Sequence, residues 1–162
     1  MDKRAIYAML ARRGVWHEAT EHAAVFNMAE ASALTLPYPE AEAKNLFLRD
    51  DRRQDYCLVT VRGDKRVDLK AFRRAQGTRP LRFATEEELA ALLGLAPGAV
   101  TPLGLLNDGE HRVRWFVDGA FWEEPGLIGV HPNDNTATVW LRADDLLALI
   151  REHGNEARVV KL

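Results

Sequence analysis

The chain has 162 residues, of which 47% are hydrophobic and 28% charged, and this composition excludes a disordered or fibrous protein. No apolar run approaches the roughly 20 residues that cross a bilayer, and the N-terminus lacks the apolar core of a secretory signal. Cys57 is the single cysteine, which excludes an internal disulfide and a CxxC zinc pair. We therefore expect a cytoplasmic protein that forms one domain over residues 1–162.

The net charge is −2, but it is distributed unevenly. Residues 49–82 contain eleven Lys or Arg and five Asp, a local charge of +6, whereas residues 1–48 sum to −1 and residues 83–162 to −7. Salt limits electrostatic reach to about 8–10 Å, so a local cationic region can bind phosphates whatever the total charge. The alternative is a solvated surface of strand ends and one helix.

Periodicity and capping residues predict alternating helices and strands in the first half of the chain. Asp2 can cap a helix whose apolar positions recur at helical spacing and which Gly14 ends. The elements that follow are a strand over 15–20, a helix over 27–35, strands over 45–49 and 56–61 joined by a polar turn, and a helix from Asp68 to Ala75.

The second half continues the same alternation. Thr85 and Glu88 form a capping-box pattern at the start of a helix that Gly94 ends. The other predicted elements are a strand over 81–84, strand-like pieces over 99–106, strands over 112–118 and 136–141, a helix over 144–153 and a strand over 158–162. Interspersed helices and strands, several joined by tight turns, predict an α/β or α+β domain with a mixed sheet, and we take α/β as the fold class.

The usual catalytic motifs are missing from this sequence. It has no GxSxG elbow, no HExxH pair, no glycine-rich phosphate loop and no His/Cys cluster with metal-ligand spacing. Cys57 lies in a strand pattern, which favours a buried small hydrophobe over a nucleophile. We therefore expect neither a metal nor a cofactor.

Three segments place polar groups or glycines where a simple strand would not need them. Lys44 and Asn45 precede an apolar strand, where they can hold an anion or where they merely begin a solvated strand. The loop from Gly98 to Gly104 contains Pro102, and it can offer backbone N–H groups to an oxyanion or form an ordinary bend. His131, stiffened by the proline that follows it, is either a functional or a turn histidine.

Taken together, these segments resemble the YbaK/ProX family of aminoacyl-tRNA deacylases, which is related to the editing insertion domain of bacterial prolyl-tRNA synthetase. The resembling stretches are AKNLFLRD over 43–50, LGLAPGAVTPLGLLND over 93–108 and HPNDNTAT over 131–138, with weaker agreement over 21–26 and 67–70. The similarity is greatest to the alanyl-tRNA(Pro) deacylase branch, called ProXp-ala or PrdX. It covers nearly the whole chain in order and implies a mixed, barrel-like sheet flanked by helices.

The resemblance also implies roles for particular residues. Lys44 would be the essential lysine of the catalytic site and would anchor the terminal adenosine of the substrate through phosphate, and Asn45 would help to position it. His131 corresponds to the histidine associated with selectivity for alanine. The implied catalytic loop matches a GxxxP motif whose backbone amides would face the ester carbonyl, and it consists of Gly98, Ala99, Val100, Thr101 and Pro102. The remaining substrate-binding residues expected are Val25, Phe26, Gly104 and Pro132.

The implied reaction is hydrolysis of the ester that joins alanine to proline tRNA, by attack of water with help from the ribose 2′-hydroxyl. The expected partners are the acceptor end of proline tRNA and prolyl-tRNA synthetase, and neither DNA nor a membrane. Two alternatives stay open. One is a deacylase for another small amino acid such as serine, threonine or cysteine, and the other is a tRNA-binding module without turnover.

Overall fold

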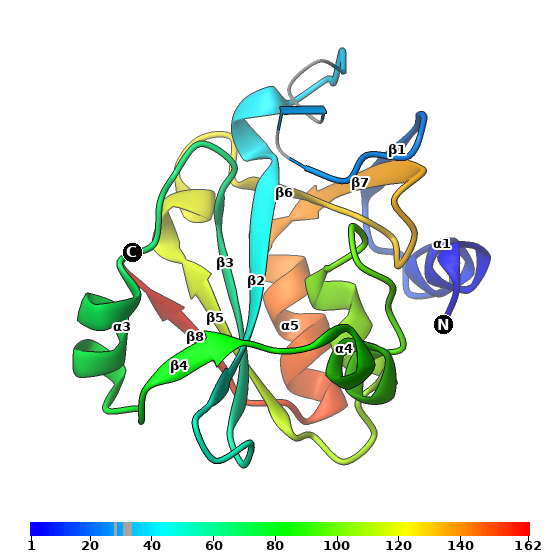
Figure 1. The fold of residues 1–162 in the computed structure, drawn as a ribbon. Coiled ribbons are helices and arrows are strands. Elements are labelled where there is room, and N and C mark those ends of the chain that lie inside the picture. Colours follow the sequence, from blue (N-terminus) through cyan, green and yellow to red (C-terminus); the bar gives the residue numbers. More distant parts are fainter. Residues whose placement is uncertain (28, 31–33) are drawn as a thin grey trace.

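The computed structural model describes residues 1–27, 29–30 and 34–162 of the chain. Figure 1 shows a twisted five-stranded sheet with a second, three-stranded sheet across one end of it. The strand order is β4-β2-β3-β5-β8 in the larger sheet and β1-β7-β6 in the smaller. The strands are β1 (His17–Glu21), β2 (Ala43–Asp50), β3 (Tyr56–Arg62), β4 (Leu81–Phe83), β5 (Val113–Asp118), β6 (Leu127–Val130), β7 (Ala137–Arg142) and β8 (Ala157–Val160).

The mixed sheet flanked by helices that the sequence predicts is confirmed. Strand β2 pairs antiparallel with β3 and β4, whereas β5 pairs parallel with β3 and β8. The predicted hairpin is β2–β3, and its register places Asn45 opposite Thr60. The two sheets do not close into a barrel. They meet instead at a bridge between Glu42, just before β2, and Gly129 of β6.

Capping residues begin the helices where the sequence predicts. The Asp2 carboxylate accepts the Ala5 N–H at 2.8 Å, and Thr85 and Glu88 form a reciprocal capping box. Among the described residues, every helix is too short or too polar to span a bilayer. The helices are α1 (Lys3–Arg12), α3 (Leu69–Gln76), α4 (Glu86–Leu93) and α5 (Ala143–His153), and the 3₁₀ turns are η1 (Pro39–Ala41), η2 (Pro102–Asn107) and η3 (Gly119–Trp122).

The prediction of strand-like pieces over 99–106 is wrong, because the 3₁₀ helix η2 occupies most of this stretch. The Thr101 hydroxyl oxygen accepts the Leu103 N–H at 3.3 Å, and the fixed φ of Pro102 suits the first position of a helix. Leu103 and Leu105 are fully buried. The apolar run that suggested a strand therefore packs as a tight turn beside α4 and α5.

Two other elements differ from the prediction. Strand β6 was not predicted, because four residues that include Gly129 give too short an alternation to detect. Of the helix predicted over 27–35, residues 29 and 30 are helical and residues 27, 34 and 35 are not. Residues 28 and 31–33 lie outside the described residues.

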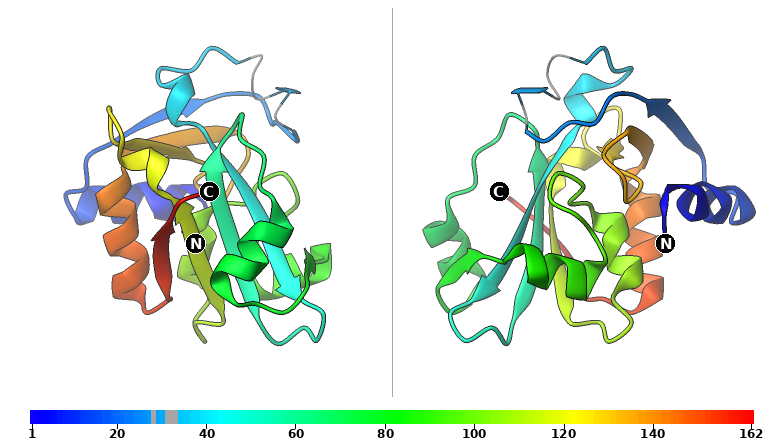
Figure 2. Two further views of the ribbon diagram at one scale, coloured as in Figure 1. Left: turned by 90° about the vertical axis from the view of Figure 1, so that its left-hand side faces the viewer. Right: turned by 45° about the vertical axis from the view of Figure 1, so that its right-hand side comes forward.

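The five-stranded sheet is buried on both faces. Leu58 and Trp115 contribute to a large core that includes residues of α1, α4 and α5, whereas Val59 and Phe116 point into a smaller core beneath Phe72 of α3. The right view of Figure 2 shows α3 and α5 on opposite sides of the sheet. This double burial explains why β3 is almost continuously apolar, as is usual for central strands covered by helices.

Cys57 lies in the smaller core and is 2% exposed, which confirms its predicted role as a buried hydrophobe. Burial raises the pKa of its thiol to about 12, so the reactive thiolate is not populated at neutral pH. Cys57→Ser should lower the free energy of unfolding by about 1–3 kcal/mol, because the hydroxyl is desolvated in an apolar cluster. Urea denaturation with Cys57→Ala as the control tests this. A serine variant as stable as the alanine variant would contradict it.

Candidate functional site

A cavity of about 240 Å³ lies where β2 begins, and residues of both sheets line it. Seven of the residues predicted from the sequence line this cavity: Val25, Phe26, Lys44, Asn45, Gly98, Val100 and His131. Six further lining residues were not predicted: Asn27, Glu42, Ala43, Gly129, Val130 and Thr138. Segments far apart in the chain therefore meet at one pocket.

The Lys44 ammonium group is held at the pocket by the loop between β3 and α3. Its Nζ donates to the Lys65 carbonyl at 2.5 Å. That carbonyl is itself fixed, because Lys65 Nζ donates to Asp118 Oδ2 at 2.6 Å and Asp118 is buried at the end of β5. An ammonium group has three N–H donors. Lys44 therefore retains donors for an anion in the pocket.

Asn45 is oriented by a hydrogen-bond chain that begins in the core. Trp115 Nε1 donates to Thr60 Oγ1 at 2.8 Å, and Thr60 Oγ1 donates to Asn45 Oδ1 at 2.6 Å. The amide oxygen of Asn45 is thus occupied, and its NH₂ group remains as the donor. The pairing of Asn45 with Thr60 across β2 and β3 creates this arrangement.

The Gly98 loop brings backbone N–H groups to the pocket. Gly98 has φ +86, and a Cβ there would lie 3.0 Å from Phe26 Cδ1. The N–H groups of Gly98, Val100 and Thr101 have no acceptor among the described residues. The Ala99 N–H differs, because it already donates to the Ala96 carbonyl at 3.1 Å. Gly98 and Val100 are therefore the pocket-lining residues of this loop with available amides.

Five predicted residues lie outside the pocket lining. Ala99, Pro102 and Pro132 are buried; Ala99 and Pro132 are next to pocket-lining residues in the chain, whereas Pro102 is not. A Cβ on Gly104 would approach Leu95 Cδ1 to 2.5 Å, so that glycine allows close packing of η2. Thr101 joins two parts of the site, since its hydroxyl donates to the His131 carbonyl at 2.6 Å.

Thr101→Val should lower the free energy of unfolding by about 1–3 kcal/mol, because it leaves the His131 carbonyl without this donor and removes the cap of η2. The change keeps the shape of the side chain. Urea denaturation measures the loss. Thr20→Val is the matched control, since the Thr20 hydroxyl has no hydrogen bond among the described residues. Equal stability losses in both variants would count against this role for Thr101.

His131 presents a neutral ring to the pocket. Its Nδ1 lies 2.8 Å from the Ala137 carbonyl, which can only accept, so Nδ1 carries the proton. Burial lowers the pKa of His131 below its ordinary 6.5 and keeps the ring uncharged at pH 7. Nε2 then carries a lone pair, and it has no hydrogen-bond partner in the described ranges.

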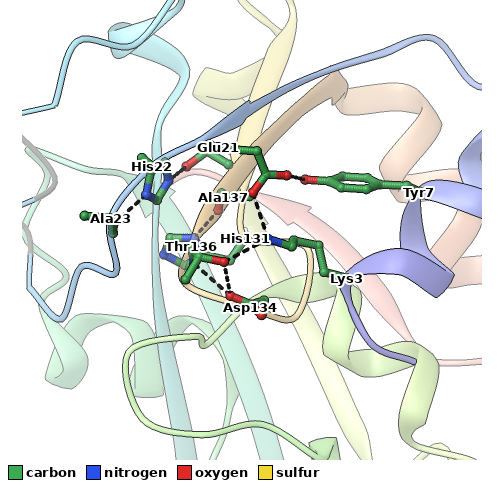
Figure 3. Close-up of polar contacts among 10 residues, drawn as sticks. Lys3, Tyr7, Glu21, His22, Ala23, His131, Asp134, Thr136 and Ala137 are labelled. Carbon is green, nitrogen blue, oxygen red and sulfur yellow. Dashed lines mark hydrogen bonds and ion pairs between the residues drawn. The ribbon is translucent and has the colours of Figure 1, made fainter.

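Helix α1 holds the loop that carries His131, as Figure 3 shows. Lys3 Nζ donates to Glu21 Oε2 at 2.7 Å and to Thr136 Oγ1 at 2.9 Å, while Tyr7 donates to the other Glu21 oxygen. Thr136 in turn donates to Asp134, and these hydrogen bonds lower the pKa of the Asp134 carboxyl. The loop after β6 is thus attached to the N-terminal helix.

Gly129 lines the pocket at a position where a side chain would clash with Trp140. A Cβ there would lie 2.5 Å from Nε1 of Trp140, which is fully buried directly behind it. The Trp140 N–H has no acceptor among the described residues. The indole ring and the pocket are therefore separated by a glycine backbone alone.

Glu42 is the acidic residue of the pocket lining, and the sequence did not predict it. Burial raises the pKa of its carboxyl, and the proximity of His22 partly offsets this shift. Across the described part of the chain, no cation lies within ion-pair distance of Glu42, and no three His, Cys, Asp or Glu residues are grouped to hold a metal ion. A carboxylate at the start of a strand carries no motif, so the sequence alone gave no signal.

The cationic segment over 49–82 is only partly neutralised. Arg49, Arg62, Lys65 and Arg79 form ion pairs with Glu88, Glu123, Asp118 and Asp51. The exposed cations of this segment that lack an ion pair in the described residues are Arg52, Arg53, Arg66, Lys70, Arg73, Arg74 and Arg82. The ion-paired cations therefore fit the interpretation as a solvated surface, whereas the exposed cations without an ion pair fit the interpretation as a phosphate-binding region.

Comparisons with known proteins agree on one family. The model of the aminoacyl-tRNA editing domain matches residues 22–149. The chain is 34% identical to a prolyl-tRNA editing protein ProX of Acetoanaerobium sticklandii, over 99% of this chain and 97% of that one. It is 33% identical to a prolyl-tRNA synthetase associated domain-containing protein 1 of Bos taurus, over 95% and 91%. A crystal structure of a candidate trans-editing enzyme for prolyl tRNA synthetase is similar with a TM-score of 0.69 and 25% identity, over 99% and 96%.

Proposed function

The chain belongs to the aminoacyl-tRNA editing domain family, and on that premise we propose that it is a deacylase that removes alanine from mischarged proline tRNA. The observation that carries this proposal is the convergence of Lys44, the Gly98 loop and His131 on one small cavity. An aminoacyl ester is already activated. Its hydrolysis therefore depends more on positioning and on stabilising the oxyanion than on a strong nucleophile.

The donors of the pocket suit the negative parts of such a substrate. The N–H groups of Gly98 and Val100 stabilise the carbonyl oxygen as it becomes an oxyanion. Lys44 binds a phosphate of the terminal nucleotide, and the Asn45 NH₂ group donates to a substrate oxygen. Phe26, which is 67% exposed at the pocket, offers a face on which a base can stack.

The reaction follows from these positions. The oxygen of a water molecule adds to the ester carbonyl carbon, and the bond from that carbon to the ribose oxygen breaks. The 2′-hydroxyl of the ribose accepts the proton of the water and passes one to the leaving 3′-oxygen. The products are alanine and the free 3′ end of the tRNA.

Selectivity for alanine rests on size and on the wall that Val25 and His131 contribute. Clashes reject a larger side chain more sharply than a pocket rejects a smaller one. Proline is therefore excluded if the side-chain part of the pocket is too small for its ring. Serine, threonine and cysteine are close enough in size that direct measurement must separate them from alanine.

The exposed cations of the 49–82 segment supply contacts for the phosphates of the tRNA acceptor end, and prolyl-tRNA synthetase is the proposed second partner. We also propose that the whole chain, residues 1–162, acts as one domain. The family match begins at residue 22, but helix α1 lies before it and holds the His131 loop through Lys3.

A panel of mischarged tRNAs tests the function. Purified protein is incubated with proline tRNA that carries alanine, serine, threonine, cysteine or proline, and release of the amino acid is followed over time. We expect alanine to be released fastest and proline not above background. Faster release of another amino acid would reassign the substrate. Salt-sensitive tRNA binding with no release from any substrate would mark a binding module.

A further inference from the structure

The polar groups of the pocket fall into donors and acceptors, and the acceptors make no hydrogen bond to the substrate in the mechanism above. Lys44, Asn45 and the Gly98 loop present N–H groups. Glu42, Thr138 and His131 line the same cavity and have side-chain atoms with lone pairs. The negative parts of an ester substrate account for the first group. A different part of the ligand must match the second.

Thr138 and His131 are fixed as acceptors by their surroundings. His22 Nδ1 lies 2.8 Å from the Ala23 carbonyl and carries the proton, so in the neutral ring Nε2 accepts from the Thr138 hydroxyl at 2.9 Å. The hydrogen of that hydroxyl is thus occupied, and its lone pairs are left for the pocket. His131 is in the same state, because its Nδ1–H is bound to the Ala137 carbonyl.

The three acceptors also cluster in space around His22. Its ring bonds Thr138, stacks edge-on against His131 at 6.2 Å between centroids, and lies near Glu42. Glu42 and Lys44 line the same cavity, yet no ion pair joins them within 4.0 Å in the described residues. Two opposite charges that share a pocket without pairing are both available to a ligand that carries both signs.

We infer that Glu42, assisted by Thr138 and His131, binds the α-ammonium group of the aminoacyl moiety. This inference rests on the proposed function, because an aminoacylated tRNA end carries one ammonium group beside its phosphates. A primary ammonium has three N–H donors, and the cluster offers three acceptors of which one is charged. Binding there holds the amino acid while Lys44 holds the nucleotide, so the ester between them faces the Gly98 loop.

The test compares two non-hydrolysable ligands by isothermal titration calorimetry. The first is 3′-deoxy-3′-(L-alanylamino)adenosine 5′-phosphate, and the second is its N-acetyl derivative, which lacks the charge. The wild-type protein is expected to bind the free amine at least tenfold more tightly. In Glu42→Gln the preference should fall below about twofold, entirely through weaker binding of the free amine. The matched control is Glu40→Gln, which removes the same charge from an exposed position two residues away.

Ligand preference, melting temperature and deacylation together distinguish a role of Glu42 in ligand binding from a role in stability and from the proposed enzymatic activity. A Glu42→Gln variant that keeps the tenfold preference, including one in which binding of both ligands is weakened by the same factor, overturns the inference. So does a wild-type protein without the preference. Because the carboxyl has a raised pKa and no cationic partner in the described residues, Glu42→Gln should leave the melting temperature unchanged or higher. A clear fall would mark Glu42 as structural. Ligand preference is measured without catalysis, so a failure to deacylate alanyl-tRNA(Pro) counts against the proposed function alone.

Discussion

Lys44→Ala is expected to lower deacylation of alanyl-tRNA(Pro) about 100-fold, and to change the free energy of unfolding by less than about 1.5 kcal/mol. The activity falls because a charge-assisted hydrogen bond to a phosphate is worth about 1.5–3 kcal/mol, and each 1.4 kcal/mol is about tenfold in rate or affinity. Stability changes little because, in the described structure, the folded protein uses Lys44 for a single hydrogen bond, to the Lys65 carbonyl.

Single-turnover deacylation and thermal melting of the same preparations measure the two effects. Lys161→Ala serves as the control, since it removes one exposed positive charge from a residue that does not line the pocket. Its rate should stay within about twofold of the wild type. A Lys44→Ala protein that is as active as this control, or that loses several kcal/mol of stability as a core deletion does, would disprove the role assigned to Lys44.

Gly98→Ala should lower the rate by about 100-fold or more, together with a loss of about 1–3 kcal/mol in stability. Two effects combine in this variant. The backbone at φ +86 is strained for any L-residue, and the new Cβ meets Phe26 at 3.0 Å and the Val25 carbonyl at 3.4 Å. Relief of that contact moves the loop, and the amides of Gly98 and Val100 then lose their alignment with the ester carbonyl.

Gly14→Ala is the matched control for this prediction. Gly14 has φ +66, but a Cβ there would have no atom within 4 Å. The control therefore carries the backbone strain without the contact, and it should lose about 1 kcal/mol of stability at an unchanged rate. Equal rate losses in Gly98→Ala and Gly14→Ala would show that a general loss of stability, rather than displacement of the Gly98 loop, explains the effect.

Local signals in the sequence predicted much of the fold and part of the site. Asp2 and Thr85 begin helices and Gly94 ends one. They act through backbone hydrogen bonds and dihedral angles that nearby residues determine. Lys44 and Gly98 could be selected because a lysine at the mouth of a strand and a glycine-rich loop are unusual in their local context.

The remaining site residues depend on contacts that no local pattern encodes. Glu42 belongs to the pocket because it forms a bridge with Gly129 of β6, and strand β6 was not predicted. Thr138 presents an acceptor because His22, 116 residues away in sequence, binds its hydroxyl hydrogen. Pro102 and Gly104 were selected because their motif is distinctive, and in the structure their side of the loop packs into the core.

The glycine backbone between the cavity and Trp140 has an optical consequence. An indole that is fully buried and has no hydrogen bond among the described residues should emit at short wavelength, and its emission is sensitive to small changes in the local field. A ligand that enters the pocket brings charge to the other side of Gly129. The protein thus carries an intrinsic fluorophore in the wall of its own binding site, and occupancy can be followed by fluorescence without a label.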